Sequence, residues 1–179
     1  GFVKPYKGMT ILLNSLAWVR AALKRFQLLV VGESMVSVSA YQKRLKRAGL
    51  TNFVKWSNGY ASEEESRWYF AAADVVVLPY MKASTSAVLL QAYSAGRPVV
   101  ASAVGDIPAM VEDQKTGLLV PPKEPMALAN AIIKVIQDEE TARKMGANGR
   151  ELLKSRFNWI RAARQTETLY RNVYKHRFQ

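Results

Sequence analysis

The chain alternates short, wholly apolar runs with longer stretches whose apolar residues recur at helical spacing. Leu12, Leu16 and Val19 fall on one helix face, which predicts an amphipathic helix over residues 9–23. The run 75–78 is apolar at every position, as expected of a strand buried on both faces. By the same reasoning, helices are predicted over residues 36–48, 62–73, 86–95, 108–112, 125–138, 139–154 and 158–175, and strands over residues 27–31, 52–56, 74–78, 98–101 and 118–120.

Cap residues and aromatic residues add detail to this pattern. Ser62 and Glu65 have the spacing of a capping box, which places the start of a helix at residue 62. Trp68 and Tyr69 follow on the same helix and are expected in the core, as is Trp56, because large aromatic side chains bury much apolar area.

Strands that are apolar throughout and separated by helices predict an α/β protein with a parallel sheet covered on both faces. Right-handed crossovers between such strands give a doubly wound, Rossmann-like fold. In this class a ligand lies at the carboxyl ends of the strands, so loops that follow strands are the places to look for chemistry.

Composition narrows the classes of function. The chain has 179 residues, one domain's worth, with 49% hydrophobic residues and no apolar run near the roughly 20 residues of a membrane span. It has no cysteine, which excludes disulfides and thiolate metal sites. His176 is the only histidine, so a histidine-clustered metal site is excluded and no metal is expected.

Positive charge is concentrated in the first third of the chain. Residues 1–62 hold ten lysines and arginines and a single acid, Glu33, so this third carries +9 (10 − 1) of the net charge of +12. Such a field attracts phosphate groups on a nucleotide, a lipid or a nucleic acid, although a solvated basic face has the same composition.

Two loops before helices are suited to an anion. Lys7 stands just ahead of the helix 9–23, where free N–H groups favour a phosphate, and Gly8 would let a ligand approach the backbone. The segment 83–87 offers Ser84, Thr85 and Ser86 ahead of the helix 86–95; these hydroxyls could hold a diphosphate or sugar, or could simply cap the helix. Neither the G-x-G-x-x-G fingerprint nor the Walker loop occurs in the chain.

Several of these segments together resemble a known family. In order along the chain, the sequence from 1–8, 31–33, 72–74, 76–79, 92–102, 104–108 and 116–120 is similar to the C-terminal domain of GT-B glycosyltransferases of family four, the glycosyl transferases group 1. The resemblance implies a domain, residues 1–157, that binds a nucleotide-diphosphate sugar for transfer with retention at the anomeric carbon. It implies no cofactor beyond that donor substrate.

The resemblance also implies roles for single residues. Lys7 matches the family lysine that holds the diphosphate, and Lys4 is expected to supply a second charge where the family's arginine is replaced by Phe2. The family's two glutamates, eight residues apart, correspond to Ala83 and Gln91; Gln91 can still bond a ribose hydroxyl, and Ser84, Thr85 and Ser86 are expected to replace the other contact. The full set of expected donor-binding residues is Lys4, Lys7, Gly8, Gly32, Glu33, Ser57, Tyr60, Ser84, Thr85, Ser86, Ala87 and Gln91. No nucleophile or general base can be assigned.

The resemblance further implies a missing partner domain. Gly1 matches the glycine that follows the first, central strand of this domain in relatives, and the helix over 158–179 is expected to cross to an N-terminal domain that binds the acceptor. The 179 residues alone are therefore expected to be inactive. We expect a cytoplasmic protein, peripheral at anionic membranes through the basic residues 43, 44, 46 and 47, with no specific nucleic-acid binding. A non-catalytic module that keeps the fold is the alternative, favoured by Ala83 and Gln91.

Overall fold

The computed structural model describes residues 1–178, with side chains throughout except at position 159 and from 175 onward. Its helices and strands follow the predicted order. The α-helices are α1 (Met9–Ala22), α2 (Val38–Arg47), α3 (Glu63–Ala72), α4 (Ala87–Ser94), α5 (Ile107–Met110), α6 (Pro125–Gln137), α7 (Glu139–Arg156) and α8 (Trp159–Phe178), with 3-10 helices η1 (Pro5–Lys7) and η2 (Thr51–Phe53). The strands are β1 (Leu28–Val31), β2 (Val54–Ser57), β3 (Val76–Leu78), β4 (Val99–Ser102) and β5 (Gly117–Val120).

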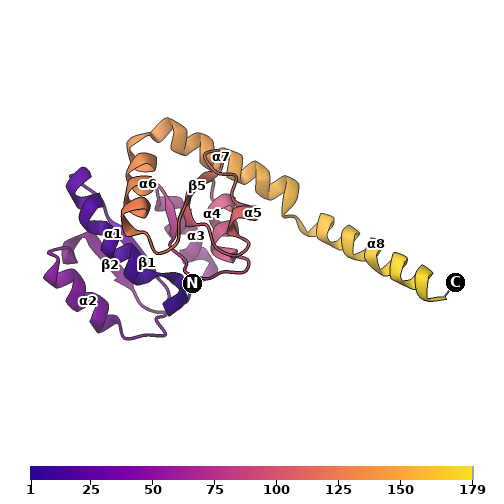
Figure 1. Cartoon of the computed structure of the whole chain (residues 1–179), viewed down its shortest axis with the longest axis horizontal. Helices are drawn as coiled ribbons and strands as arrows, with labels where there is room; N and C mark the ends of the chain where they lie inside the picture. The colour runs from indigo at the N-terminus through magenta and orange to yellow at the C-terminus, as the bar shows by residue number, and fades with distance from the viewer. Residues whose placement is uncertain (179) are drawn as a thin grey trace.

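The strands form two sheets, and the strands within each sheet run parallel. Helices connect successive strands, which confirms the α/β fold class (Figure 1). In one sheet β1 pairs with β2, placing Leu28 opposite Val54. In the other the order is β3-β4-β5, placing Val76 opposite Val99 and Val99 opposite Gly117. Within residues 1–178 no strand joins β1 to β3.

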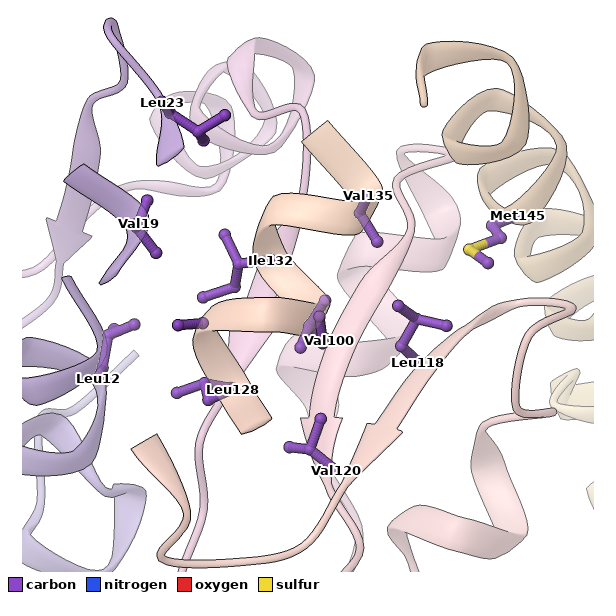
Figure 2. Packing of buried hydrophobic residues seen from close by; sticks show 12 residues of the cluster. Leu12, Val19, Leu23, Val100, Leu118, Val120, Leu128, Ile132, Val135 and Met145 are labelled. Carbon is purple, nitrogen blue, oxygen red and sulfur yellow. The ribbon is translucent and has the colours of Figure 1, made fainter. Parts of the chain in front are cut away.

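Helix α1 connects the two sheets by packing along α6. Figure 2 shows Leu12, Val19 and Leu23 of the α1 segment facing Leu128 and Ile132 of α6. The opposite side of this cluster is formed by the strand residues Val100, Leu118 and Val120 and by Met145 of α7. Another face of α1 contacts Leu45 and Leu50 at the end of α2. A single helix therefore contributes to the cores of both halves.

The second half has its own core around Tyr93 of α4, which is 0% exposed. Its hydroxyl lies 2.7 Å from Thr116 Oγ1 and donates to the carbonyl oxygen of Met110 at 3.3 Å. Helix α7 comes so close that a Cβ on Gly149 would overlap the Tyr93 ring, and a Cβ on Gly146 would overlap the Gly96 carbonyl. The glycines therefore set the distance between α4 and α7.

Three details differ from the sequence analysis. Trp68 is 65% exposed and Tyr69 only half-buried, so the prediction that both belong to the core was wrong. Residues 52 and 53, expected in a strand, belong to η2, because Phe53 turns inward to stack on Phe26 with ring centroids 5.0 Å apart. Trp56 is half-buried and stacks on Tyr41.

Helix α8 extends away from the rest of the molecule (Figure 1). Its described side chains, residues 160–174, are exposed, including Ile160, Leu169, Tyr170 and Tyr174. The side chain of Trp159, the first residue of α8, lies outside the described side chains. Among the described residues, no helix combines the length and apolar character that crossing a bilayer requires.

Candidate functional site

The segment 1–8 lies across the carboxyl ends of β1 and β3. On the β3 side, the Tyr6 carbonyl oxygen accepts a hydrogen bond from Met81 N at 2.7 Å. Gly8 has a left-handed backbone (φ +72°), and a Cβ there would overlap the Pro79 carbonyl oxygen. Glycine is required at this position both by its conformation and by this close approach.

On the β1 side, the same segment runs beside residues 31–33, at the end of β1. The Gly1 nitrogen donates to the Val31 carbonyl oxygen at 3.2 Å, and Val3 N donates to the Glu33 carbonyl oxygen at 2.8 Å. Gly32 is buried with φ +137°, and a Cβ on it would overlap the Gly1 carbonyl oxygen. The segment 1–8 is therefore hydrogen-bonded to both halves of the fold.

Helix α4 begins beside this segment. Its N-cap is Ser86, which is buried and whose hydroxyl accepts from Leu89 N at 3.3 Å. A Cβ on Gly1 would lie 3.2 Å from Lys7 Nζ and 3.6 Å from Val88 Cγ2, so the Lys7 ammonium and the first turn of α4 both lie beside Gly1. Ser84, Thr85 and Ala87 are exposed around this turn, as is Gln91 one turn further along the helix.

The electrostatics of this region favour an anion. Burial lowers the pKa of Lys7 below its usual value, and the positive charge of Lys4 lowers this pKa further. Lys7 Nζ lies 5.9 Å from the centre of the Tyr80 ring, and Lys4 Nζ lies 5.8 Å from that of Phe2. The first turns of α1 and α4 contain no acidic residue, so their helix dipoles add to the same positive potential. A bound anion would stabilise the charged form of Lys7, which burial and the charge of Lys4 both disfavour in the free chain.

The end of β2 lies beside the turn that follows β1. The Ser57 carbonyl oxygen accepts from Gly32 N at 3.1 Å, and Asn58 Oδ1 accepts from Ser34 N at 2.9 Å. These bonds place Ser57 next to the segment that contains Gly32 and Glu33. Tyr60 projects into solvent with 88% of its surface exposed.

Most of the predicted site residues thus gather at one edge. Lys4, Lys7 and Gly8 share one segment; Gly32, Glu33 and Ser57 adjoin it through backbone hydrogen bonds; the start of α4 meets it at Lys7. The Ser86 hydroxyl is engaged in capping α4, the simpler of the two roles considered for it. Whether each residue contacts a donor stays a prediction.

Three supporting residues were missed by the sequence analysis. Tyr80 lies beneath the Lys7 ammonium, and Asn58 holds the turn after β1. Gly105 has φ +52°, and a Cβ on it would overlap the Ala83 carbonyl oxygen, so the loop after β4 supports the segment 83–87. Of the three, only Gly105 lies in a segment that resembles the family, residues 104–108.

Comparison with known proteins identifies relatives that match most of the chain. The family model described as "Glycosyl transferases group 1" matches residues 1–138. The chain is 28% identical to the D-inositol 3-phosphate glycosyltransferase of Corynebacterium glutamicum over 97% of its own length but only 42% of that protein. It spans about two fifths of the length of such curated relatives.

Solved structures agree. HepE of Anabaena, crystallised in complex with UDP-glucose, superposes with a TM-score of 0.84 at 27% identity, over 95% of this chain and 47% of that one. The C-terminal domain of a group 1 glycosyl transferase from Francisella tularensis superposes with a TM-score of 0.80 at 23% identity, over 89% of this chain and 84% of that one; it shows the shared fold.

Proposed function

Because the chain belongs to the glycosyl transferases group 1 family and has the fold of the C-terminal half of GT-B enzymes, we propose that its carboxyl edge binds a nucleotide-diphosphate sugar. One observation carries the proposal: Lys7 is half-buried, and its ammonium lies beside Gly1, next to the first turn of α4. The relative HepE, crystallised with UDP and with UDP-glucose, supports a uridine nucleotide as the first ligand to test.

In the proposed site each group has a distinct task. Lys7 and Lys4 neutralise the diphosphate, and the N–H groups that open α4 add hydrogen bonds. The sugar lies against Ser84 and Thr85, and the Gln91 amide bonds the ribose. The base lies near Ser57 and Tyr60.

The proposed reaction is sugar transfer with retention at the anomeric carbon, as part of a longer protein. The bond between the anomeric carbon and the diphosphate oxygen breaks, and the nucleoside diphosphate leaves with the bonding electrons. A hydroxyl oxygen of the acceptor bonds to the anomeric carbon and gives up its proton. Preorganised cations at the leaving group stabilise the charge that develops there. Lys7 and Lys4 would take the role that a metal ion has in other transferases. The acceptor and its activating groups would come from outside these 179 residues.

The test is calorimetric titration of the chain with UDP. Lys7→Ala should weaken UDP binding by about 1.5–3 kcal/mol, the range for a charge-assisted hydrogen bond, which is roughly 10- to 150-fold in Kd. Lys134→Ala is the matched control, because it removes the same charge from an exposed position on α6. Equal affinity of the Lys7→Ala variant and the parent chain would refute the assignment.

A pH series gives a second readout. Burial and Lys4 lower the pKa of Lys7 in the free chain, whereas a bound diphosphate favours the charged ammonium and must raise that pKa again. UDP affinity should therefore fall as pH rises through the lowered pKa of Lys7. The Lys7→Ala variant should lack this dependence.

A further inference from the structure

A second positive surface lies at the opposite edge of the β1–β2 sheet. It consists of exposed lysines and arginines at the end of α1, along α2 and at the start of β2; we call it the basic surface. Its members are Arg20, Lys24, Arg25, Lys43, Arg44, Lys46, Arg47 and Lys55. No role in the proposed donor site uses any of them.

The fold explains why these residues come together. Helices α1 and α2 each precede a strand of the same parallel sheet, so both helices end at its amino edge. Side-chain contacts join the two ends: Phe26 stacks on Phe53, and the Arg20 guanidinium lies 4.8 Å from the centre of the Phe53 ring. Leu45 and Leu50 pack in the same cluster, with Phe26 against it.

The charge of this surface is not neutralised locally. In the part of the chain that the structure describes, none of the eight residues forms an ion pair. The one acid of residues 1–62, Glu33, follows β1 and lies at the carboxyl edge. The acids that follow α6, which packs along α1, are Asp138, Glu139 and Glu140; the Asp138 carboxylate accepts a hydrogen bond from Thr141 N, and Glu140 pairs with Lys144.

We propose that the basic surface attaches this protein to an anionic lipid bilayer. Clusters of four to eight lysines and arginines on an amphipathic helix are typical of anionic-lipid binding, and α2 turns Leu45 inward and its basic residues outward. Binding of single-stranded nucleic acid would call for free aromatic side chains on which bases stack. Here Phe26 and Phe53 stack on each other and Tyr41 stacks on Trp56, so the exposed aromatic side chain beside these residues is Trp18 of α1.

The attachment leaves the donor site accessible. A four-residue strand separates the two edges by roughly 13 Å, so a bilayer at the amino edge lies away from the segment 1–8. Nucleotide binding and lipid binding should therefore be independent of each other. This separation allows the two proposals to fail separately.

The experiment is flotation of the chain with vesicles of pure phosphatidylcholine and of phosphatidylcholine containing phosphatidylserine. We expect binding to the anionic vesicles only, and loss of binding as salt is raised. A variant that replaces four basic residues of α2 should lose more than a hundredfold in vesicle affinity. A matched control removes four charges from α7 and should keep its affinity. The variant is Lys43→Gln, Arg44→Gln, Lys46→Gln and Arg47→Gln; the control is Arg143→Gln, Lys144→Gln, Lys154→Gln and Arg156→Gln.

Three results would overturn the proposal: equal binding to neutral and anionic vesicles, unchanged binding of the α2 variant, or tighter binding to short RNA or DNA than to vesicles at the same salt. Far-ultraviolet circular dichroism of both variants checks that they fold, and UDP titration separately checks the donor site. If the α2 variant fails to fold, the dependence of vesicle binding by the parent chain on lipid charge and on salt still tests the proposal.

Discussion

Replacing Tyr93 by phenylalanine tests whether the buried hydroxyl fastens α4 to the chain around α5 and β5. The hydroxyl is within hydrogen-bond distance of Thr116 Oγ1 (2.7 Å) and of the Met110 carbonyl oxygen (3.3 Å), and the side chain is 0% exposed. Thr116 keeps its bonds with Glu112 in the variant, so only the tyrosine's own contacts are lost. A neutral hydrogen bond of this kind is worth about 1 kcal/mol. For a chain of this size, Tm should fall by about 2–4 °C.

The alkaline pH dependence gives a sharper signature. Burial raises the pKa of Tyr93 to about 12 from an ordinary value of 10.0. A raised folded-state pKa contributes stability that is complete below pH 10 and is lost as pH rises from 10 to 12, because only the unfolded chain ionises there. By pH 10.5 this loss is on the order of 1 kcal/mol. The advantage of the parent chain over Tyr93→Phe should therefore shrink almost to zero between pH 8 and pH 10.5.

The assay is urea denaturation followed by far-ultraviolet circular dichroism at several pH values. The difference between the two proteins isolates Tyr93, since every other residue, including the buried Tyr80, is the same in both. Tyr60→Phe is the control, because Tyr60 is 88% exposed and its replacement should change nothing. A difference in unfolding free energy that stays constant from pH 8 to pH 10.5 would refute the reasoning.

Two further predictions concern packing and activity. Gly149→Ala should destabilise the chain by about 1–3 kcal/mol in thermal unfolding, because the new Cβ overlaps the Tyr93 ring, although helix propensity alone predicts a gain of about 0.8–1 kcal/mol. The exposed Ala147→Gly in the same helix should cost about 1 kcal/mol, and a Gly149→Ala variant more stable than the parent would contradict the contact. Purified residues 1–179 should bind UDP yet transfer no sugar from labelled UDP-glucose, because the site offers cations and hydroxyls but no assigned general base; measured transfer to any acceptor would disprove this.

The order of elements could be predicted because it depends on local signals. Ser62 and Glu65 form the capping box that their spacing predicts, with Glu65 Oε2 accepting from Ser62 N at 2.8 Å. The start of α4 after Ser86 was predicted on the same basis. Such caps involve residues three positions apart, so the sequence contains the whole interaction.

Burial and long-range contacts could not be predicted in this way. Trp68 was expected in the core because of its size, but the half of α3 that faces the sheet is occupied by Phe70 instead. The contact between Gly149 and Tyr93 joins residues 56 positions apart in the sequence (149 − 93), and no local pattern indicates it. At the candidate site, the lysines and glycines could be named from a resemblance. The half-burial of Lys7 above Tyr80 follows only from the tertiary structure.

The hydrogen bonds that hold the segment 1–8 to both halves of the fold constrain how those halves can slide. The β1–β2 sheet and the β3–β4–β5 sheet share no ladder within residues 1–178, and packed helices such as α1 and α6 can shear past one another by 1–2 Å. Such a shear would have to stretch either the Val3–Glu33 bond or the Tyr6–Met81 bond. A ligand held by Lys7 and the start of α4 would strengthen the attachment of the segment 1–8 to the second half, so its binding would also restrict how the two halves move relative to each other.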